Sequence, residues 1–179
     1  MSTEASVPIR LAQTLGITSS LMLGGLSLGF SSFTVPRLME SPTPLMLRQW
    51  KKMYIAGRNV AIPTALLSSL SYFYLAYRSH NSNPFSSSLS SSTTAYALSG
   101  LLTIGIVPVT IIVLGSTNKK LERKEEEMRS LKDGDEVVQV GLGEENAHVL
   151  IDRWATLNLG RVVMLVAASI VGIWTSVSN

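Results

Sequence analysis

Two arginines lie inside long apolar stretches of the sequence, Arg58 and Arg161. An ionisable side chain is costly inside a membrane-spanning segment, so it usually faces the interior of a helix bundle or its water-filled end. The alternative is that each side chain snorkels to the membrane interface from near the end of a helix. Because arginine stays protonated, neither residue is a candidate general base. Both are the first candidates for a functional site.

Aromatic, amide and hydroxyl residues accompany the arginines at helical spacing. Trp50, Tyr54 and Arg58 follow one another in four-residue steps, so at about 100° per residue Trp50 and Tyr54 lie close together with Arg58 at the edge of the same helix face. A second group falls within about 60° of one face and consists of Trp154, Asn158 and Arg161. A stripe that ends near Asn118 contains Thr103, Thr110 and Thr117. Interfacial aromatic residues, and threonines that bond to their own helix, are also common without a functional role.

The elements that must position these residues are four apolar stretches of about 20 residues, near 15–35, 55–77, 95–115 and 157–175, each long enough to cross the hydrocarbon core as a helix. Spanning β-strands are shorter and alternate in polarity. The sequence therefore predicts an all-α bundle of four transmembrane helices in a single membrane domain over residues 1–179. A cleaved signal peptide would leave three spans, but the first apolar run passes into Pro36 and Arg37 without a clear cleavage site.

The basic residues predict how the spans are oriented. Segments 36–54 and 116–156 contain eleven lysines and arginines, namely Arg37, Arg48, Lys51, Lys52, Lys119, Lys120, Arg123, Lys124, Arg129, Lys132 and Arg153. The opposite side carries two, Arg10 and Arg78. This asymmetry predicts that 36–54 and 116–156 are cytosolic loops and that both termini are luminal or exoplasmic.

This orientation gathers polar and aromatic residues from all four helices in the cytosolic half. The residues concerned are Arg37, Trp50, Tyr54, Arg58, Thr110, Asn118, Trp154, Asn158 and Arg161. Unpaired polar groups of this kind cost several kcal/mol in a membrane interior, which a bundle built only for stability would avoid. We expect a cavity for a partly polar aromatic molecule, with a purely structural polar cluster as the alternative.

The composition excludes several kinds of chemistry. The sequence has no cysteine, which removes disulfides, thiolate ligands and cysteine nucleophiles. Its two histidines, His80 and His148, fall in different predicted loops, so they cannot form a histidine-rich di-iron site. The pI near 9.3 reflects basic residues beside membrane spans, so the expected partner is the lipid bilayer and not nucleic acid.

The motifs together resemble the anthrone oxygenase family, small four-helix membrane proteins associated with aromatic polyketide pathways, mostly fungal. The matching residues are Trp50-x3-Tyr54-x2-Gly57 followed by Pro63, Pro108-x-Thr110 with Asn118-x2-Leu121 after it, and Trp154-x3-Asn158-x2-Arg161. The resemblance covers nearly the whole chain in order and spacing.

This resemblance implies oxidation of an anthrone to an anthraquinone, with molecular oxygen as co-substrate and no metal or flavin cofactor. An anthrone loses a proton to give an electron-rich aromatic oxyanion, which can pass an electron to oxygen directly. Arg58, Arg161 and Asn158 are then the expected catalytic residues, with the arginines stabilising the oxyanion. The expected substrate-binding residues are Trp50, Tyr54, Thr110, Asn118 and Trp154.

The general base and the cellular context stay open. His148 titrates in a useful range, although a continuous helix directs it about 120° away from Trp154. Asp152, Tyr54, solvent and the acidity of the substrate itself are the alternatives. The other function considered is a non-enzymatic tetraspan protein that binds or carries a lipophilic aromatic metabolite. We expect an endoplasmic reticulum membrane, and a homo-oligomer is one of the open states of assembly.

Overall fold

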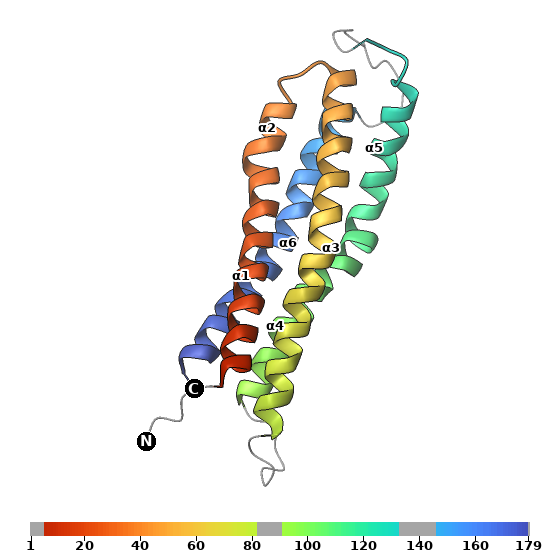
Figure 1. Cartoon of the computed structure of the whole chain (residues 1–179). Helices are drawn as coiled ribbons and strands as arrows, with labels where there is room; N and C mark the ends of the chain where they lie inside the picture. The colour runs from red at the N-terminus through yellow and green to blue at the C-terminus, as the bar shows by residue number, and fades with distance from the viewer. Residues whose placement is uncertain (1–5, 82–90, 133–145, 179) are drawn as a thin grey trace. The chain divides into compact units, whose positions relative to one another are not determined.

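The computed structural model describes residues 6–81, 91–132 and 146–178, in which every regular element is a helix. The elements are α1 (Val7–Gly29), η1 (Phe30–Thr34), α2 (Val35–Leu38), α3 (Thr43–Asn81), α4 (Ser91–Val109), η2 (Thr110–Leu114), α5 (Gly115–Glu127) and α6 (Ala147–Val177) (Figure 1). The two η elements are π-helical turns, and each lies next to a proline, Pro36 or Pro108. Proline removes a backbone donor from the helical ladder, and a π turn is one way to absorb such a local disruption.

Four helical runs of the described chain are long and apolar enough to cross a membrane, namely Val7–Leu38, Thr43–Asn81, Ser91–Glu127 and Ala147–Val177. Large apolar side chains such as Leu101, Ile112 and Trp174 are exposed on the isolated chain. Such a surface suits contact with lipid and not with water. The prediction of an all-α fold with four transmembrane helices is confirmed, and the chain is a multi-pass membrane protein.

The helices extend beyond the apolar stretches into segments 36–54 and 116–156, as the helical spacing of Trp50 with Tyr54 and of Trp154 with Asn158 predicts. Helix α3 begins at Thr43 within segment 36–54, and α5 continues to Glu127 within segment 116–156. Arg123 and Glu127 lie one turn apart near the polar end of α5 and form an ion pair with an Nε–Oε1 distance of 2.7 Å. This pair stabilises the end of the helix. Helix α6 begins at Ala147, while residues 133–145 of the predicted loop lie outside the described part of the chain.

The chain divides into two compact units, and each contains a part of all four spans. Unit 1 comprises Met1–Gly25, Ala61–Val107 and Val162–Asn179, and unit 2 comprises Leu26–Val60 and Pro108–Arg161. All of the site residues proposed above lie in unit 2.

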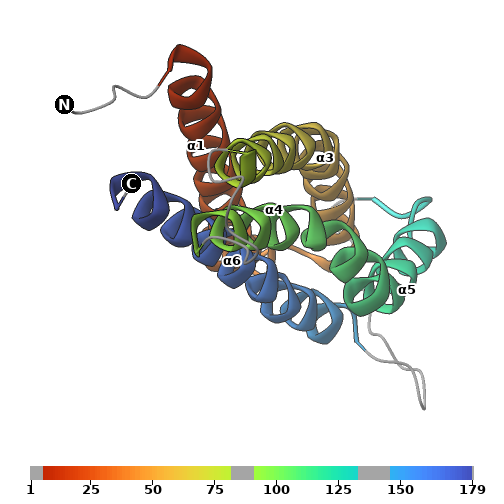
Figure 2. The same cartoon turned by 90° about the horizontal axis from the view of Figure 1, so that it is seen from below.

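Unit 1 is held together by buried hydroxyl groups as well as apolar contacts. The Ser20 hydroxyl lies 2.8 Å from that of Ser169 and 3.1 Å from that of Tyr72, which joins α1, α3 and α6. Tyr96 of α4 similarly contacts Gln13 at 3.2 Å and Ser176 at 3.1 Å. Figure 2 shows these four helices from below. Because the buried hydroxyls are satisfied, this network is suited to fixing the packing of the helices.

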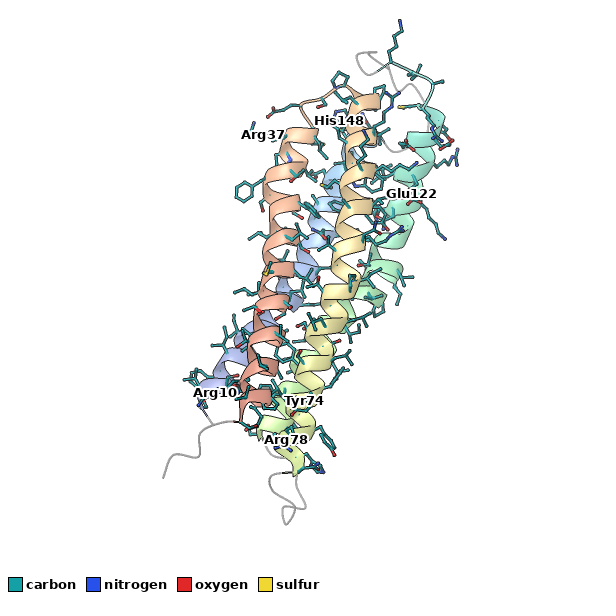
Figure 3. The ribbon with its side chains drawn as sticks, viewed as in Figure 1. Arg10, Arg37, Tyr74, Arg78, Glu122 and His148 are labelled. Carbon is teal, nitrogen blue, oxygen red and sulfur yellow. The ribbon has the colours of Figure 1, made fainter. Side chains whose placement is uncertain are left out.

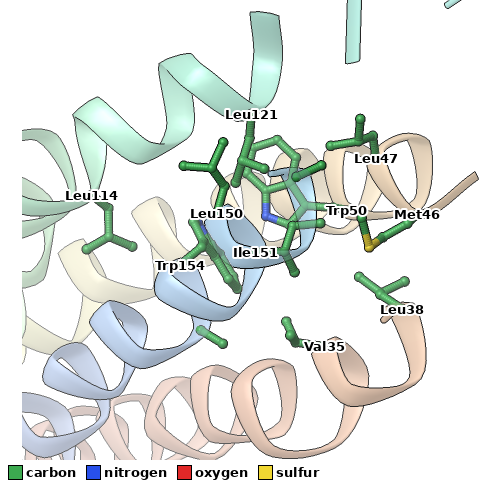
Figure 4. Close-up of a cluster of buried hydrophobic side chains, with 12 residues drawn as sticks. Val35, Leu38, Met46, Leu47, Trp50, Leu114, Leu121, Leu150, Ile151 and Trp154 are labelled. Carbon is green, nitrogen blue, oxygen red and sulfur yellow. The ribbon is translucent and has the colours of Figure 1, made fainter. Parts of the chain in front are cut away.

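Unit 2 has an apolar core in which two tryptophans are central. The buried cluster consists of Val35, Leu38, Met46, Leu47, Trp50, Leu114, Leu121, Ala147, Leu150, Ile151, Trp154 and Ala155 (Figure 4). Glycine at position 57 permits close packing beside it, since an added Cβ would stand 2.7 Å from the ring of Phe30. The polar groups described next lie within and beside this core.

Candidate functional site

Three aromatic rings from two helices form the centre of the candidate site. Trp50 of α3 is fully buried and Trp154 of α6 is 2% exposed. Their ring centroids lie 6.2 Å apart in an edge-to-face arrangement, and Tyr54 stacks on Trp50 at 5.4 Å with an interplanar angle of 3°. The four-residue spacing of Trp50 and Tyr54 therefore produces the shared face that the sequence predicts. Both geometries are favourable for aromatic pairs.

Tyr54 connects the aromatic centre to polar groups on neighbouring helices. The amide Nδ2 of Asn118, on α5, donates a hydrogen bond to the Tyr54 hydroxyl at 3.3 Å. The guanidinium carbon of Arg58 lies 5.8 Å from the centroid of the Tyr54 ring, within the range of a cation–π contact. Tyr54 also interacts electrostatically with Arg161 of α6. The phenol thus lies where three of the four spans contribute polar side chains.

Arg161 is half-buried and is held by Asn158, three residues earlier on α6. Its Nη1 donates to the Asn158 side-chain oxygen at 3.2 Å. Asn158 itself is fully buried, and its Nδ2 donates at 2.9 Å both to the Ser27 carbonyl oxygen and to the Ser31 hydroxyl. The guanidinium therefore has one anchored end.

Four buried polar atoms have no hydrogen-bond partner within the described residues, and all four belong to unit 2. They are Nε1 of Trp50, Oδ1 of Asn118, Nε1 of Trp154 and Nε of Arg161. A buried donor or acceptor without a partner costs about 1–3 kcal/mol, and more when it is charged. Native proteins rarely keep such groups without a reason, so this cluster is the candidate binding site within the described residues. Three donors and one acceptor suit a molecule that carries an oxyanion or carbonyl together with a hydroxyl group.

The other predicted site residues lie farther from this cluster or on its surface. Arg58 and Asp152 are exposed, and Thr110 is half-buried in η2. Arg37 is exposed and pairs with Glu40, with an Nη1–Oε1 distance of 2.7 Å. His148 is half-buried in the first turn of α6, where its backbone N–H donates to Oδ1 of Asn146 at 3.0 Å, and Figure 3 labels it with Arg37. The structure thus brings Arg161, Tyr54, Asn118 and the two tryptophans together, with Arg58 on the outer side of Tyr54.

Two polar features beside the site were missed in the sequence. Ser31 and the Ser27 carbonyl hold Asn158, and a four-residue spacing within the first apolar stretch is the signal that could have indicated them. The other feature is an ion pair between Lys51 of α3 and Glu125 of α5, whose carboxylate-bearing side chain is only 8% exposed. These residues lie far apart in sequence, so only their packing reveals the pair.

The described residues, 6–81, 91–132 and 146–178, contain no group of three or more His, Asp or Glu side chains that could hold a metal ion. The donors found here suit an organic anion better than a metal. Of the three unpartnered donors, two are indole N–H groups, which do not coordinate metal ions, and the third belongs to a guanidinium.

The sequence is similar to known proteins over most of its length. A family model described as anthrone oxygenase matches residues 50–171. An anthrone oxygenase from Emericella nidulans is 30% identical in an alignment of 192 positions, which covers 91% of this chain and 95% of the relative. One from Paecilomyces divaricatus is 27% identical, covering 90% and 92%, and a noranthrone monooxygenase from Aspergillus flavus is 25% identical, covering 87% and 68%. No solved structure gives a significant match.

Proposed function

Because the chain belongs to the anthrone oxygenase family, we propose that it oxidises an anthrone to the corresponding anthraquinone with molecular oxygen, in the biosynthesis of an aromatic polyketide. The names of the relatives support an oxygenase over a non-enzymatic carrier of the same kind of molecule. The observation within the structure that supports it most is the set of four unpartnered buried polar atoms in unit 2.

The reaction places demands on a protein that are mainly electrostatic. The central methylene carbon of the anthrone loses a proton, and the negative charge moves to the ketone oxygen as the middle ring becomes aromatic. This anion transfers one electron to oxygen, and the resulting radical and superoxide combine at the same carbon as a peroxide. Loss of water from the protonated peroxide leaves the second carbonyl. One oxygen atom enters the quinone and the other leaves as water, so no further reductant is needed.

Arg161 is the central residue for stabilising the anion. Its Nε–H is buried and unpartnered, and its positive charge is held in a setting where water does not screen it fully. The indole N–H groups of Trp50 and Trp154 add two neutral donors of the kind that stabilise an oxyanion. Donors that are already in place when charge develops need no reorganisation during the reaction, which is the reason they accelerate it.

Asn118, Tyr54 and Arg161 bind the substrate. The unpartnered Oδ1 of Asn118 accepts a hydrogen bond from a substrate hydroxyl, while its Nδ2 remains on Tyr54. Tyr54 and Arg161 are half-buried, so they form the accessible side on which a flat ring can lie. Arg58 acts through its contact with the Tyr54 ring, and Thr110 stays a predicted substrate contact.

Tyr54 is our candidate for the group that takes the proton. Its hydroxyl already accepts a hydrogen bond from Asn118, and Arg161 lies close enough to interact with it electrostatically. His148 remains the competing candidate, but its place in the first turn of α6 is six residues before Trp154, on another face of the helix. Variants of Tyr54 and of His148 can show which of the two residues takes the proton.

We further propose that the reaction needs no metal or flavin, and that the protein works in the endoplasmic reticulum membrane with segments 36–54 and 116–156 toward the cytosol. The donor set described above supports direct reaction of the anion with oxygen. The basic residues of the segments that belong to unit 2 support the orientation. The similarity to anthrone oxygenases from Paecilomyces divaricatus and Emericella nidulans is the reason for expecting this organelle.

The direct test is turnover by the purified protein in lipid nanodiscs, in air-saturated buffer that contains a metal chelator. We expect quinone formation well above the spontaneous oxidation of the anthrone, and a loss of about 10²–10³-fold in kcat for Arg161→Ala. Arg78→Ala is the matched control, since Arg78 is exposed and belongs to unit 1, and it should retain full activity. A wild-type rate equal to the spontaneous rate would remove the enzymatic function.

A further inference from the structure

Ser31 is a buried serine whose hydroxyl donates to another helix, as that of Ser68 also does. Buried serines in helices commonly donate to the carbonyl four residues earlier, as Ser99 does to Ala95 at 3.1 Å and Ser169 to Leu165 at 2.9 Å. Ser31 instead donates across to α6, to the carbonyl oxygen of Ala155 at 2.9 Å. It lies in the π turn η1, where Val35 N–H bonds to the Phe30 carbonyl, five residues back. The local helix geometry at Ser31 therefore differs from that of an ordinary α-helix.

This choice of acceptor determines how the Asn158 amide must be oriented. A serine hydroxyl has one hydrogen, and at Ser31 that hydrogen points to the Ala155 carbonyl. The Ser31 oxygen can then only accept, as can the Ser27 carbonyl oxygen, and both lie 2.9 Å from the same Asn158 nitrogen. The nitrogen side of the amide must face these two acceptors. Its oxygen consequently faces Arg161, which can only donate.

We propose that Ser31 is a positioning residue that orients the Arg161 guanidinium through Asn158. Arg161 Nη1 donates to the amide oxygen at 3.2 Å, which fixes one end of the planar guanidinium. The rigid plane then determines where Nε–H points, and this is the buried donor without a partner in the described structure. The role rests on the proposed function, in which that donor meets the substrate oxyanion.

The hydrogen bonds that run from Ser31 through Asn158 to Arg161 extend the site beyond the region matched by the family model. Ser31 lies N-terminal to the matched residues 50–171, whereas Asn158 and Arg161 lie within them. Ser31 is 9% exposed and Asn158 is fully buried, so water cannot easily replace either group. Loss of the Ser31 hydroxyl leaves an Asn158 N–H short of an acceptor and frees the amide to rotate, which misplaces the guanidinium.

The test compares Ser31→Ala with Ser20→Ala. Ser20 is also a buried serine that bonds to neighbouring helices, through Tyr72 and Ser169, but it belongs to unit 1 and has no place in the proposed chemistry. We expect both variants to lower the thermal midpoint in nanodiscs, while only Ser31→Ala lowers kcat, by on the order of 10–100-fold, with little change in KM. The pair Ser31→Thr and Ser31→Val has matched shapes, and only Ser31→Thr should keep most of the turnover.

Two results would overturn the positioning role. One is a kcat for Ser31→Ala equal to that of the wild type. The other is an equal fall in kcat for Ser20→Ala or for both members of the Thr and Val pair, which would show a purely structural effect. Failure of the proposed function is distinguishable, because the wild type itself would then produce quinone no faster than the spontaneous reaction.

Discussion

Arg161 donates a hydrogen bond from Nη1 to Oδ1 of Asn158 at 3.2 Å, while Nε of the same guanidinium is buried and has no partner in the described residues. The side chain is thus anchored at one end and unsatisfied at the other. An arrangement built for stability alone would satisfy both, since an unpaired charged donor is among the most costly groups to bury. The unsatisfied Nε is therefore the part of the guanidinium that we expect to meet the substrate.

Replacement of Trp154 by phenylalanine should separate the indole N–H from the aromatic ring. We expect Trp154→Phe to lower kcat by about 10–100-fold, because one donor to the oxyanion is lost while ring packing is largely kept. The measurement is steady-state quinone formation. Trp174→Phe is the control, because Trp174 is 74% exposed in unit 1, and its turnover should match that of the wild type. Equal rates for the two variants would rule out a role for the Trp154 N–H.

Asn118→Leu should weaken recognition of a hydroxyl group. Leucine has nearly the same shape, but the change removes the hydrogen bond that Nδ2 donates to the Tyr54 hydroxyl together with the unsatisfied Oδ1. We therefore expect only a modest fall in the thermal midpoint, of the size that the loss of one hydrogen bond produces. The wild type should have a kcat/KM about tenfold higher for a hydroxylated anthrone than for anthrone itself, as one hydrogen bond predicts. The variant should show no such preference, and a retained preference would contradict the role of Oδ1.

Tyr54→Phe tests the proton acceptor through the pH dependence of turnover. General base catalysis contributes about 10²–10⁴-fold, so kcat should fall by that order near neutral pH. At higher pH the substrate ionises in solution and no longer needs a base, so the defect should shrink as the pH rises. A defect of constant size across the pH range would indicate a binding role instead. His148→Ala should behave like the wild type throughout, and a pH-dependent loss in that variant would move the role to His148.

The ion pair of Lys51 and Glu125 should matter for stability. Glu125 is nearly buried, with a side chain 8% exposed, so Lys51→Met leaves a buried carboxylate without its partner. We expect a loss of about 3 kcal/mol in the free energy of unfolding in detergent, as is usual when one member of a buried pair is removed. The double variant Lys51→Met with Glu125→Met should recover most of the loss. Additive effects of the two single changes would show that the pair is not coupled.

The four spans could be predicted because each requires only a long apolar run, which the sequence displays directly. The exact first and last residues of the helices could not, since α3 begins at Thr43 and α5 ends at Glu127 in polar sequence, where ion pairs and packing replace hydropathy. The π turns were also missed. They depend on how the chain adjusts near Pro36 and Pro108, and a constant 100° per residue assumes that no such turn occurs.

The same reasons explain which parts of the site were predictable. Trp50 and Tyr54 share a face because four residues of regular α-helix separate them, and their stacking was therefore foreseeable. The exposure of Arg58 depends on what neighbouring helices cover, which its position in α3 does not reveal. Ser31 lies among other serines of the first span, and only its bonds to Ala155 and Asn158 distinguish it.

The central claim is that the buried donors of unit 2, with Arg161 foremost, stabilise the anion of the substrate. Absorption spectra of an anthrone titrated with the protein under strict exclusion of oxygen test this directly, because the anion absorbs at longer wavelength than the neutral ketone and cannot react onward. We predict that the wild type produces the anion band near neutral pH, where the free anthrone is un-ionised, and that Arg161→Ala does not. A bound anthrone that stays neutral in the wild type, or an equal band in both proteins, would contradict the account.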